Sequence, residues 1–236
     1  IQIESGYVIA SSQQLRGTKI HLGGAQGSTV TGTCNVMTAA CLARGTTVID
    51  AAACEPEVSD LGHLLRSMGA RIEGLGTSQL IIDGVEELHS ATHTVIPDRI
   101  EAGTLLMAGA MTGGDVEVQN LRADHLTAVL NVLREMGVGL EMTEPSRSPD
   151  HPVRRPTSCR VHVSPILKPI NCRALPYPEF PTDLQAQLTA LLCLVPGQSV
   201  VTDQVFPGRF MHVSELLRMG AEIRREKDSE IGRAHV

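Results

Sequence analysis

One pattern decides the fold of this chain, and its first copy reads Leu64-Leu65-Arg66-Ser67-Met68-Gly69-Ala70-Arg71-Ile72-Glu73. Residues 132–141 and 216–223 repeat it, and the third copy is one residue shorter before its Met-Gly pair. Each copy follows a strand-like stretch that begins with Gly. The stretches are residues 45–50, 114–119 and 197–202. A repeat of this kind indicates one supersecondary unit used several times. Each unit is predicted to contain a strand, a loop, an amphipathic helix that ends at the Gly, and a further strand.

A second helix is predicted before each copy, and these three helices carry almost no charge. They are residues 33–42, 99–111 and 183–194, which are rich in Ala, Leu, Met, Thr and Cys. A helix that is apolar on all sides is buried on all sides. Three units cannot each bury such a helix alone, so we expect the helices to share one centre with the sheets outside. The predicted fold class is therefore α/β, an incomplete inside-out barrel of repeated units.

Gly and Pro punctuation divides the chain into two expected domains, residues 1–96 and 97–229. Within the second domain, residues 143–181 are rich in Pro and form a long connection, with one or two strands expected, one of them at residues 160–163. Residues 230–236 read Glu-Ile-Gly-Arg-Ala-His-Val and resemble the translation of a sequencing adapter. We expect this last stretch to be an artefact and set it aside.

The composition disfavours several classes of function. The chain has 236 residues, a net charge of −6, no Trp, two Tyr and three Phe, which argues against nucleic-acid binding because base stacking needs aromatic side chains. No apolar run reaches the roughly 18 residues of a membrane span, so no membrane is expected. Six Cys show no Cys-x-x-Cys pair or zinc-like spacing, so we expect reduced thiols in the cytoplasm. We interpret His89 and His93 as part of a polar loop, not as metal ligands.

Two segments at predicted helix starts are candidates for binding. Residues 23–33 contain four Gly and several hydroxyl side chains before a helix, which makes them a candidate phosphate cradle. The alternative is a capped helix after a flexible turn. Residues 97–104 place three charges at a second helix start, where acids suit the helix dipole, and the alternative is capping with a structural salt bridge. The candidate residues are Gly27, Ser28, Thr29 and Val30 in the first segment and Asp98, Arg99 and Glu101 in the second.

Two further segments are candidates for chemistry. Residues 180–187 place Asp183 at the mouth of the third apolar helix, where a carboxylate can act as a general base. The alternative is simple compensation of the helix dipole. Residues 205–213 contain two of the three Phe, and Arg209 there could pair with an anion. The alternative for this fourth segment is a loop packed by its own aromatic side chains.

Four ordered motifs together resemble the enolpyruvyltransferase family, and within it the members that act on UDP-N-acetylglucosamine. They are residues 55–60, 97–104, 180–187 and 205–213. The resemblance implies two domains of three βαβαββ units each that close on substrate, with the last unit of one domain and two units of the other in this chain. It also implies transfer of the enolpyruvyl group from phosphoenolpyruvate to the 3′-hydroxyl of UDP-N-acetylglucosamine, with release of phosphate. It implies no metal or organic cofactor, and we expect a monomer.

The resemblance also assigns roles. It implies that Asp183 contacts the sugar and is the base for its 3′-hydroxyl, and that Val205 and Phe206 lie against the nucleotide-sugar. Arg209 belongs to the same motif and is expected to bind substrate. The loop at Gly27, Ser28, Thr29 and Val30 falls where the family holds the diphosphate, although Gly27 replaces a common Lys. Charged residues of the other motifs are expected to line the site or the face between the domains. They are Glu55, Glu57, Asp98, Arg99 and Glu101.

Some family features have no match in this sequence. Cys54 replaces a common Arg, and none of the six Cys matches the catalytic one. The catalytic Cys loop, a Lys-Asn pair and the uridine-binding segment would lie before Ile1, and two phosphoenolpyruvate-binding Arg would lie after Lys227. We therefore expect the 236-residue chain to be inactive by itself. The alternatives are the branch that acts on shikimate 3-phosphate, a non-catalytic paralogue, and a repeat scaffold.

Overall fold

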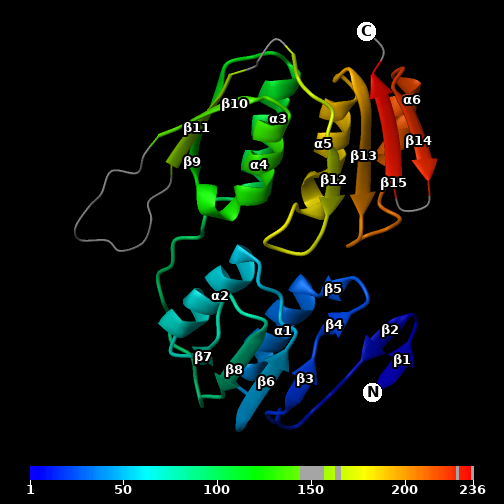
Figure 1. Ribbon diagram of the computed structural model, residues 1–236. Helices are drawn as coiled ribbons and strands as arrows, with labels where there is room; N and C mark the ends of the chain where they lie inside the picture. Colours follow the sequence, from blue (N-terminus) through cyan, green and yellow to red (C-terminus); the bar gives the residue numbers. More distant parts are fainter. Residues whose placement is uncertain (144–156, 163–165, 227–228, 235–236) are drawn as a thin grey trace. The chain divides into compact units, whose positions relative to one another are not determined.

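The structure is a computed structural model that describes residues 1–143, 157–162, 166–226 and 229–234. The chain divides into two compact units, Ile1–Val95 and Ile96–Val236, and each is described by itself (Figure 1). Within the described residues, no helix is long and apolar enough to cross a membrane.

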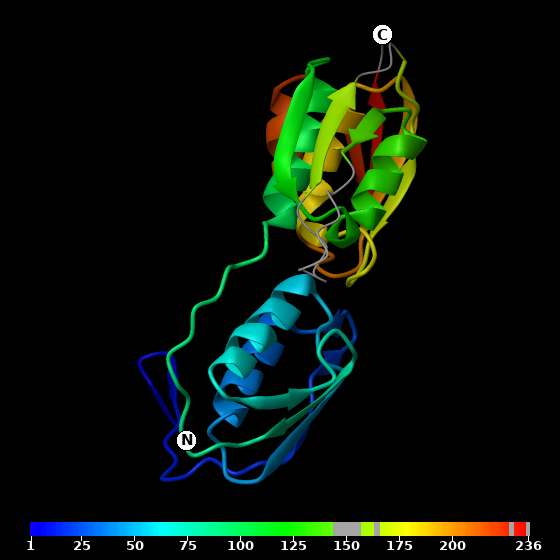
Figure 2. The same ribbon diagram turned by 90° about the vertical axis from the view of Figure 1, so that its left-hand side faces the viewer.

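The first unit is a four-stranded sheet covered by two helices. The strand order is β3 (Lys19–His21), β6 (Thr46–Asp50), β8 (Gln79–Asp83), β7 (Arg71–Glu73), and only the β3–β6 pair is parallel. Buried and more accessible residues alternate along β6 and β8, so one sheet face is buried. Helices α1 (Val30–Ala40) and α2 (Pro56–Ser67) cover that face (Figure 2). Two short hairpins, β1 (Gln2–Glu4) with β2 (Tyr7–Ile9) and β4 (Gly23–Gly24) with β5 (Gly27–Ser28), complete the unit.

Helix α1 differs from the prediction that all three uncharged helices are buried on all sides. Thr33, Met37 and Ala40 are buried, but a second face of this helix is exposed. Its exposed residues include Thr31, Asn35, Thr38 and Ala39. The reason is packing, because the first unit offers α1 one sheet and one neighbouring helix. The prediction of one shared centre for all three helices is also wrong, since α1 belongs to a separate hydrophobic cluster.

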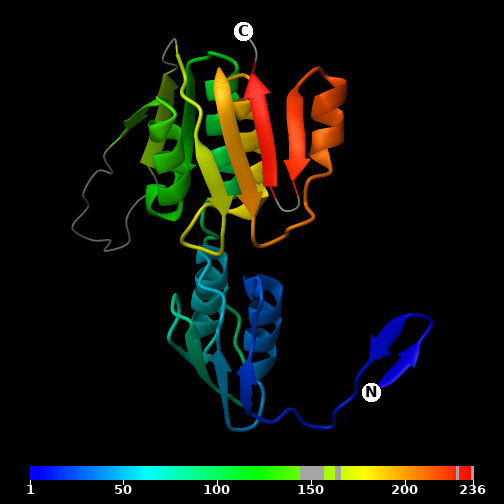
Figure 3. The same ribbon diagram turned by 45° about the vertical axis from the view of Figure 1, so that its right-hand side comes forward.

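In the part of the second unit that the structure describes, there are two sheets and four α-helices. The first sheet has the order β10-β11-β9 and is antiparallel, and the second has the order β12-β13-β15-β14 with only β12 and β13 parallel (Figure 3). In chain order the elements are α3 (Arg99–Met111), β9 (Val116–Leu121), η1 (Ala123–His125), α4 (Thr127–Glu135), β10 (Gly139–Met142), β11 (Thr157–His162), β12 (Asn171–Ala174), η2 (Thr182–Leu184), α5 (Gln185–Leu192), β13 (Gly197–Asp203), α6 (His212–Arg218), β14 (Glu222–Glu226) and β15 (Ser229–Ala234).

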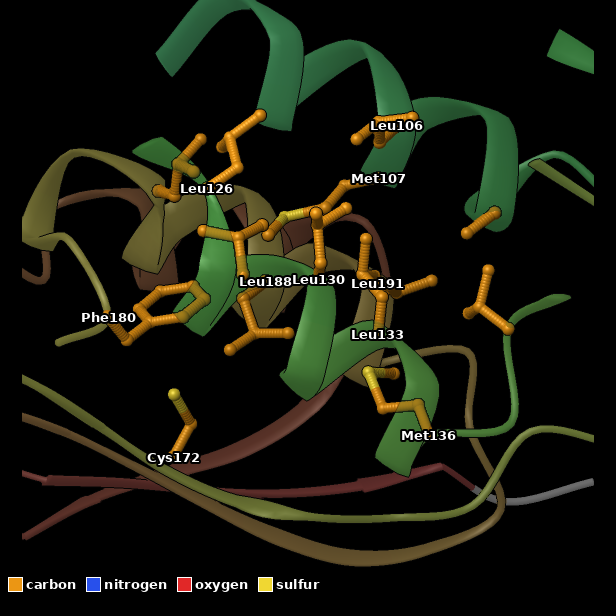
Figure 4. Packing of buried hydrophobic residues seen from close by; sticks show 14 of the residues in the cluster. Leu106, Met107, Leu126, Leu130, Leu133, Met136, Cys172, Phe180, Leu188 and Leu191 are labelled. Carbon is orange, nitrogen blue, oxygen red and sulfur yellow. The ribbon is translucent and has the colours of Figure 1, made fainter. Parts of the chain in front are cut away.

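In this unit α5 is inside, as predicted, since none of its residues is exposed. Helix α3 is mostly buried but, against the prediction, keeps one exposed face at Glu101, Leu105 and Ala108. Helix α3 packs against α5 and against β9 and β11, while α5 packs against β13 and β15. Leu106 of α3, Leu133 of α4 and Leu188 of α5 are fully buried in the same cluster (Figure 4). Burial of each such side chain contributes about 1.5–3 kcal/mol. The sheets therefore lie outside a helical core.

The local signals were mostly reliable. Gly69, Gly137 and Gly220 follow the three Met residues with φ of 102°, 91° and 97°, which confirms the predicted left-handed helix stops. Helix α3 has the predicted bounds. The strand expected at residues 160–163 is β11, whose last residue is His162, and Val163 lies outside the described residues.

Two assignments need correction. An Asp directly before an amphipathic pattern predicts a helix N-cap at Asp124, but this residue lies inside η1, and α4 begins at Thr127 with Leu126 at its N-cap position. The Asp124 carboxylate instead accepts hydrogen bonds from Arg122 at 2.9 and 2.6 Å. Strand β15 includes residues 230–234, which the sequence analysis set aside. Its main chain pairs with β13 and β14, and such pairing needs no particular side chains. The adapter origin of these residues stays a prediction for the nucleotide sequence to test.

Candidate functional site

Asp183 and Arg209 form an ion pair at the surface of the second unit. Asp183 lies in η2, directly before α5, and its Oδ1 accepts a hydrogen bond from Arg209 Nη1 at 2.6 Å. The two side chains are 52% and 46% exposed. An exposed pair of this kind contributes at most about 1 kcal/mol, so a ligand can separate it at little cost. A carboxylate able to take a proton and a cation able to hold an anion thus lie side by side.

Phe206 lies next to this pair. The Arg209 guanidinium lies 5.6 Å from the centroid of the Phe206 ring, and the residue is 55% exposed. Phe210, by contrast, is buried in the same loop. The interpretation of a loop packed by its own aromatic side chains therefore holds for Phe210 but not for Phe206. Phe206 offers an apolar surface beside a charged pair, which suits an amphipathic ligand.

Asp203 is a site residue that the sequence analysis missed. It ends β13, is fully buried, and accepts a hydrogen bond from Thr182 Oγ1 at 2.6 Å. Its other oxygen accepts from the backbone N–H groups of Val205 and Phe206 at 2.9 and 2.8 Å. Its position was a usable signal, because ligand sites of α/β sheets gather at the carboxyl ends of strands.

The start of α3 belongs to the same unit. Asp98 caps the helix, since its Oδ1 accepts from the N–H groups of Ile100 and Glu101 at 2.7 and 3.1 Å. This is the capping role of the alternative interpretation. Arg99 is buried, with its guanidinium 5.4 Å from the centroid of the Tyr177 ring. Glu101 is exposed. None of these contacts by itself identifies a ligand.

The Gly-rich loop lies in the first unit, and its last part is a capped helix start. Gly27 and Ser28 form β5, and Gly27 has a φ of 104°, which favours glycine. Thr29 is the N-cap of α1, and its hydroxyl accepts from the N–H of Gly32 at 3.2 Å. Val30 is the first residue of the helix. The structure thus supports the alternative interpretation, and phosphate binding by this loop stays a prediction.

Glu55 and Glu57 lie at the start of α2 in the same unit. Glu55 is 9% exposed and holds the N-cap position without a capping hydrogen bond from its side chain. Among the side chains that the structure describes, its Oε2 is one of few buried atoms without a hydrogen-bond partner. Burial, followed by the charges of Glu55 and Glu57, raises the pKa of the Cys34 thiol. Burial and then Glu55 raise the pKa of Cys54 in the same way, so neither thiol is an activated nucleophile.

Metal binding finds no support in the described parts of the chain, where no group of three or more His, Cys, Asp or Glu side chains could hold an ion. His93 instead contacts Asp60, with 2.9 Å between Nε2 and Oδ1. This contact fits the interpretation of a polar segment.

The structure therefore brings together Asp183, Arg209, Val205 and Phe206 through Asp203. The Gly27–Val30 loop and the two Glu residues belong to the other unit. Their meeting with Asp183 around one ligand stays a prediction.

Three comparisons with known proteins bear on this site. The sequence model of one family, described as EPSP synthase (3-phosphoshikimate 1-carboxyvinyltransferase), matches residues 1–235. Curated relatives named UDP-N-acetylglucosamine 1-carboxyvinyltransferase include that of Methylacidiphilum infernorum, 48% identical over 223 residues, which are 94% of this chain and 50% of that protein. The relative of the same name from Akkermansia muciniphila is 45% identical over 232 residues, which are 98% of this chain and 52% of that protein. The chain spans about half the length of the curated relatives it matches.

Solved structures show the same fold. The enolpyruvyl transferase NikO from Streptomyces tendae superposes with a TM-score of 0.79 at 22% identity, over 95% of this chain and 52% of that one. EPSP synthase from Acinetobacter baumannii gives a TM-score of 0.68 at 20% identity, over 94% of this chain and 49% of that one. The inside-out α/β fold is thereby confirmed.

Proposed function

Since the chain belongs to the EPSP synthase family of enolpyruvyl transferases, we propose that it is part of an enzyme that makes enolpyruvyl-UDP-N-acetylglucosamine. The 3′-oxygen of the sugar bonds to the central carbon of phosphoenolpyruvate while a proton adds to the methylene carbon. The new methyl group of the tetrahedral intermediate then loses a proton while the carbon–oxygen bond to phosphate breaks, so that the proton of the sugar hydroxyl leaves, in balance, with the phosphate. Inorganic phosphate leaves, and no oxidant or reductant is consumed.

The exposed pair of Asp183 and Arg209 is the observation that carries this proposal. A base for the sugar hydroxyl must reach solvent-borne substrate, and the Asp183 carboxylate does so. An incoming anion competes for the Arg209 guanidinium, which leaves Asp183 able to accept the proton. Phe206 and Val205 would pack against the nucleotide-sugar, since they adjoin the same pair.

The first unit would supply the remaining contacts. We propose that the Gly27–Val30 loop binds the diphosphate and that Glu55 and Glu57 line the site, with Asp98, Arg99 and Glu101 on the second unit. The product would enter peptidoglycan synthesis in the cytoplasm, and so support cell-wall growth, cell shape and division. The 44–48% identity to relatives named for UDP-N-acetylglucosamine supports this substrate.

Transfer to shikimate 3-phosphate is the second candidate. The description of the matching family model favours it, but the solved EPSP synthase is only 20% identical to this chain. A non-catalytic scaffold is a third candidate, and a reading frame without a catalytic Cys loop would support it.

Phosphate release by the product of a reading frame that contains this chain separates these candidates. We expect release only when phosphoenolpyruvate and UDP-N-acetylglucosamine are both present. Asp183→Asn should lower kcat about 10²–10⁴-fold, the usual contribution of a general base. Glu215→Gln is a matched control, because Glu215 is an exposed acid paired with Arg218 at 2.7 Å in α6. Release with shikimate 3-phosphate, or none with either acceptor, would overturn the proposal.

A further inference from the structure

Asp203 is the one fully buried carboxylate among the described residues, and its hydrogen bonds reach two separate site segments. Its Oδ2 accepts a hydrogen bond from the hydroxyl of Thr182, the residue before Asp183. Its Oδ1 accepts hydrogen bonds from the backbone N–H groups of Val205 and Phe206, in the loop that carries Arg209. Thr182 lies 21 residues before Asp203 in the sequence, so the hydrogen bond joins parts of the chain that are not neighbours. One side chain therefore joins the turn that presents the base to the loop that presents the cation.

The hydrogen bonds of Asp203 hold the two segments together more strongly than the exposed Asp183–Arg209 pair does. A buried carboxylate must be compensated, and bonds to an ionised acceptor are shorter and stronger than neutral ones. The 2.6 Å bond from Thr182 and the two backbone bonds meet that need. The Asp183–Arg209 pair is exposed and holds the segments only weakly. The loop then turns after Phe206, whose carbonyl accepts from the N–H of Arg209 at 2.9 Å.

We propose that Asp203 is a positioning residue, which holds the Thr182–Asp183 turn and the Val205–Arg209 loop at the spacing that substrate requires. This inference rests on the proposed function. Asp203 does not touch substrate. It keeps both segments in place when an anion draws Arg209 away from Asp183. Without it, opening the surface pair would release the loop.

The first arm of the test needs no substrate. Amide hydrogen exchange at Val205 and Phe206, followed by NMR in the 236-residue chain, should speed up about tenfold or more in Asp203→Asn, because the charged acceptor is lost. Ser199→Ala is the matched control. Ser199 is also buried on β13, where its Oγ accepts from the N–H of Ile170 at 3.2 Å, far along the strand from the loop. Unchanged exchange in Asp203→Asn, or an equal rise in Ser199→Ala, would overturn the inference.

The second arm uses Thr182 and covers the case in which Asp203→Asn fails to fold. Thr182→Val removes the hydroxyl donor, whereas Thr182→Ser keeps it. These variants are made in the product of a reading frame that contains this chain. We expect the dissociation constant for UDP-N-acetylglucosamine to rise about tenfold in Thr182→Val and to stay within about twofold of the unaltered protein in Thr182→Ser. Equal affinities in the two variants would overturn the inference. If the unaltered reading-frame product binds no UDP-N-acetylglucosamine, that result counts against the proposed function, and the exchange rates alone decide on Asp203.

Discussion

Replacement of Gly103 by Ala tests how α3 supports the site. An added Cβ would lie 2.4 Å from Cδ1 of Leu184, the fully buried residue that follows Asp183. Carbon atoms prefer about 3.5–4.0 Å, so one of them must move, and overpacking of this kind costs about 1–3 kcal/mol. Ala is also the better helix former by about 1 kcal/mol. The net expectation is a loss of about 1 kcal/mol in the free energy of unfolding.

Removal of the Leu184 side chain should reverse the sign of the effect that Gly103→Ala has on the free energy of unfolding. In a Leu184→Ala background the clash is gone, so Gly103→Ala should stabilise by about 1 kcal/mol. Urea unfolding followed by far-UV circular dichroism measures both effects, since the chain has no Trp for fluorescence. Gly208→Ala is the control, because nothing lies within 4 Å of its added Cβ. Equal effects of Gly103→Ala in the two backgrounds would refute the packing described here.

Three further predictions concern single contacts. The Arg122 guanidinium lowers the pKa of Asp124, so this pair should stabilise the fold at neutral pH and lose that contribution as the pH falls through the lowered pKa. Arg122→Gln should remove less than about 1 kcal/mol at pH 7 and progressively less as the pH is lowered, as urea unfolding at a series of pH values would reveal. Iodoacetamide should label Cys34 slowly at pH 7.5, and faster in Glu55→Gln, by mass spectrometry, because burial and then Glu55 raise the pKa of that thiol. Asp98→Ala should cost about 1 kcal/mol in thermal or urea unfolding, through loss of the α3 cap, whereas Asp98→Asn should cost less.

The sequence predicted what local chemistry determines. Helix α3 was placed correctly because Pro97 and Asp98 mark its start and its body carries almost no charge. The Gly that follows each Met adopts a positive φ, which few other residues tolerate. Asp183 and Arg209 were both chosen as candidates, but their direct contact depends on how η2 and the following loop pack, and no local pattern encodes that.

Other features depend on tertiary partners and could not be predicted in this way. In the sequence, Asp203 is an ordinary polar residue at the end of a strand. Only its buried position in the fold shows that it connects the Thr182 turn to the loop that follows β13. The Asp124 carboxylate accepts a hydrogen bond from Arg122 and does not cap a helix N-terminus, because a 3₁₀ turn lies between it and α4. The exposed face of α1 follows from the number of layers that pack on it, which its own composition does not reveal.

We propose that the Asp183–Arg209 pair and the adjoining Phe206 bind UDP-N-acetylglucosamine. Site-resolved NMR of the product of a reading frame that contains this chain, during titration with this nucleotide-sugar, tests the proposal most directly. We expect the amides of Thr182, Val205 and Phe206 to shift together with one dissociation constant. No shift of these amides, or the same shifts with shikimate 3-phosphate, would contradict it.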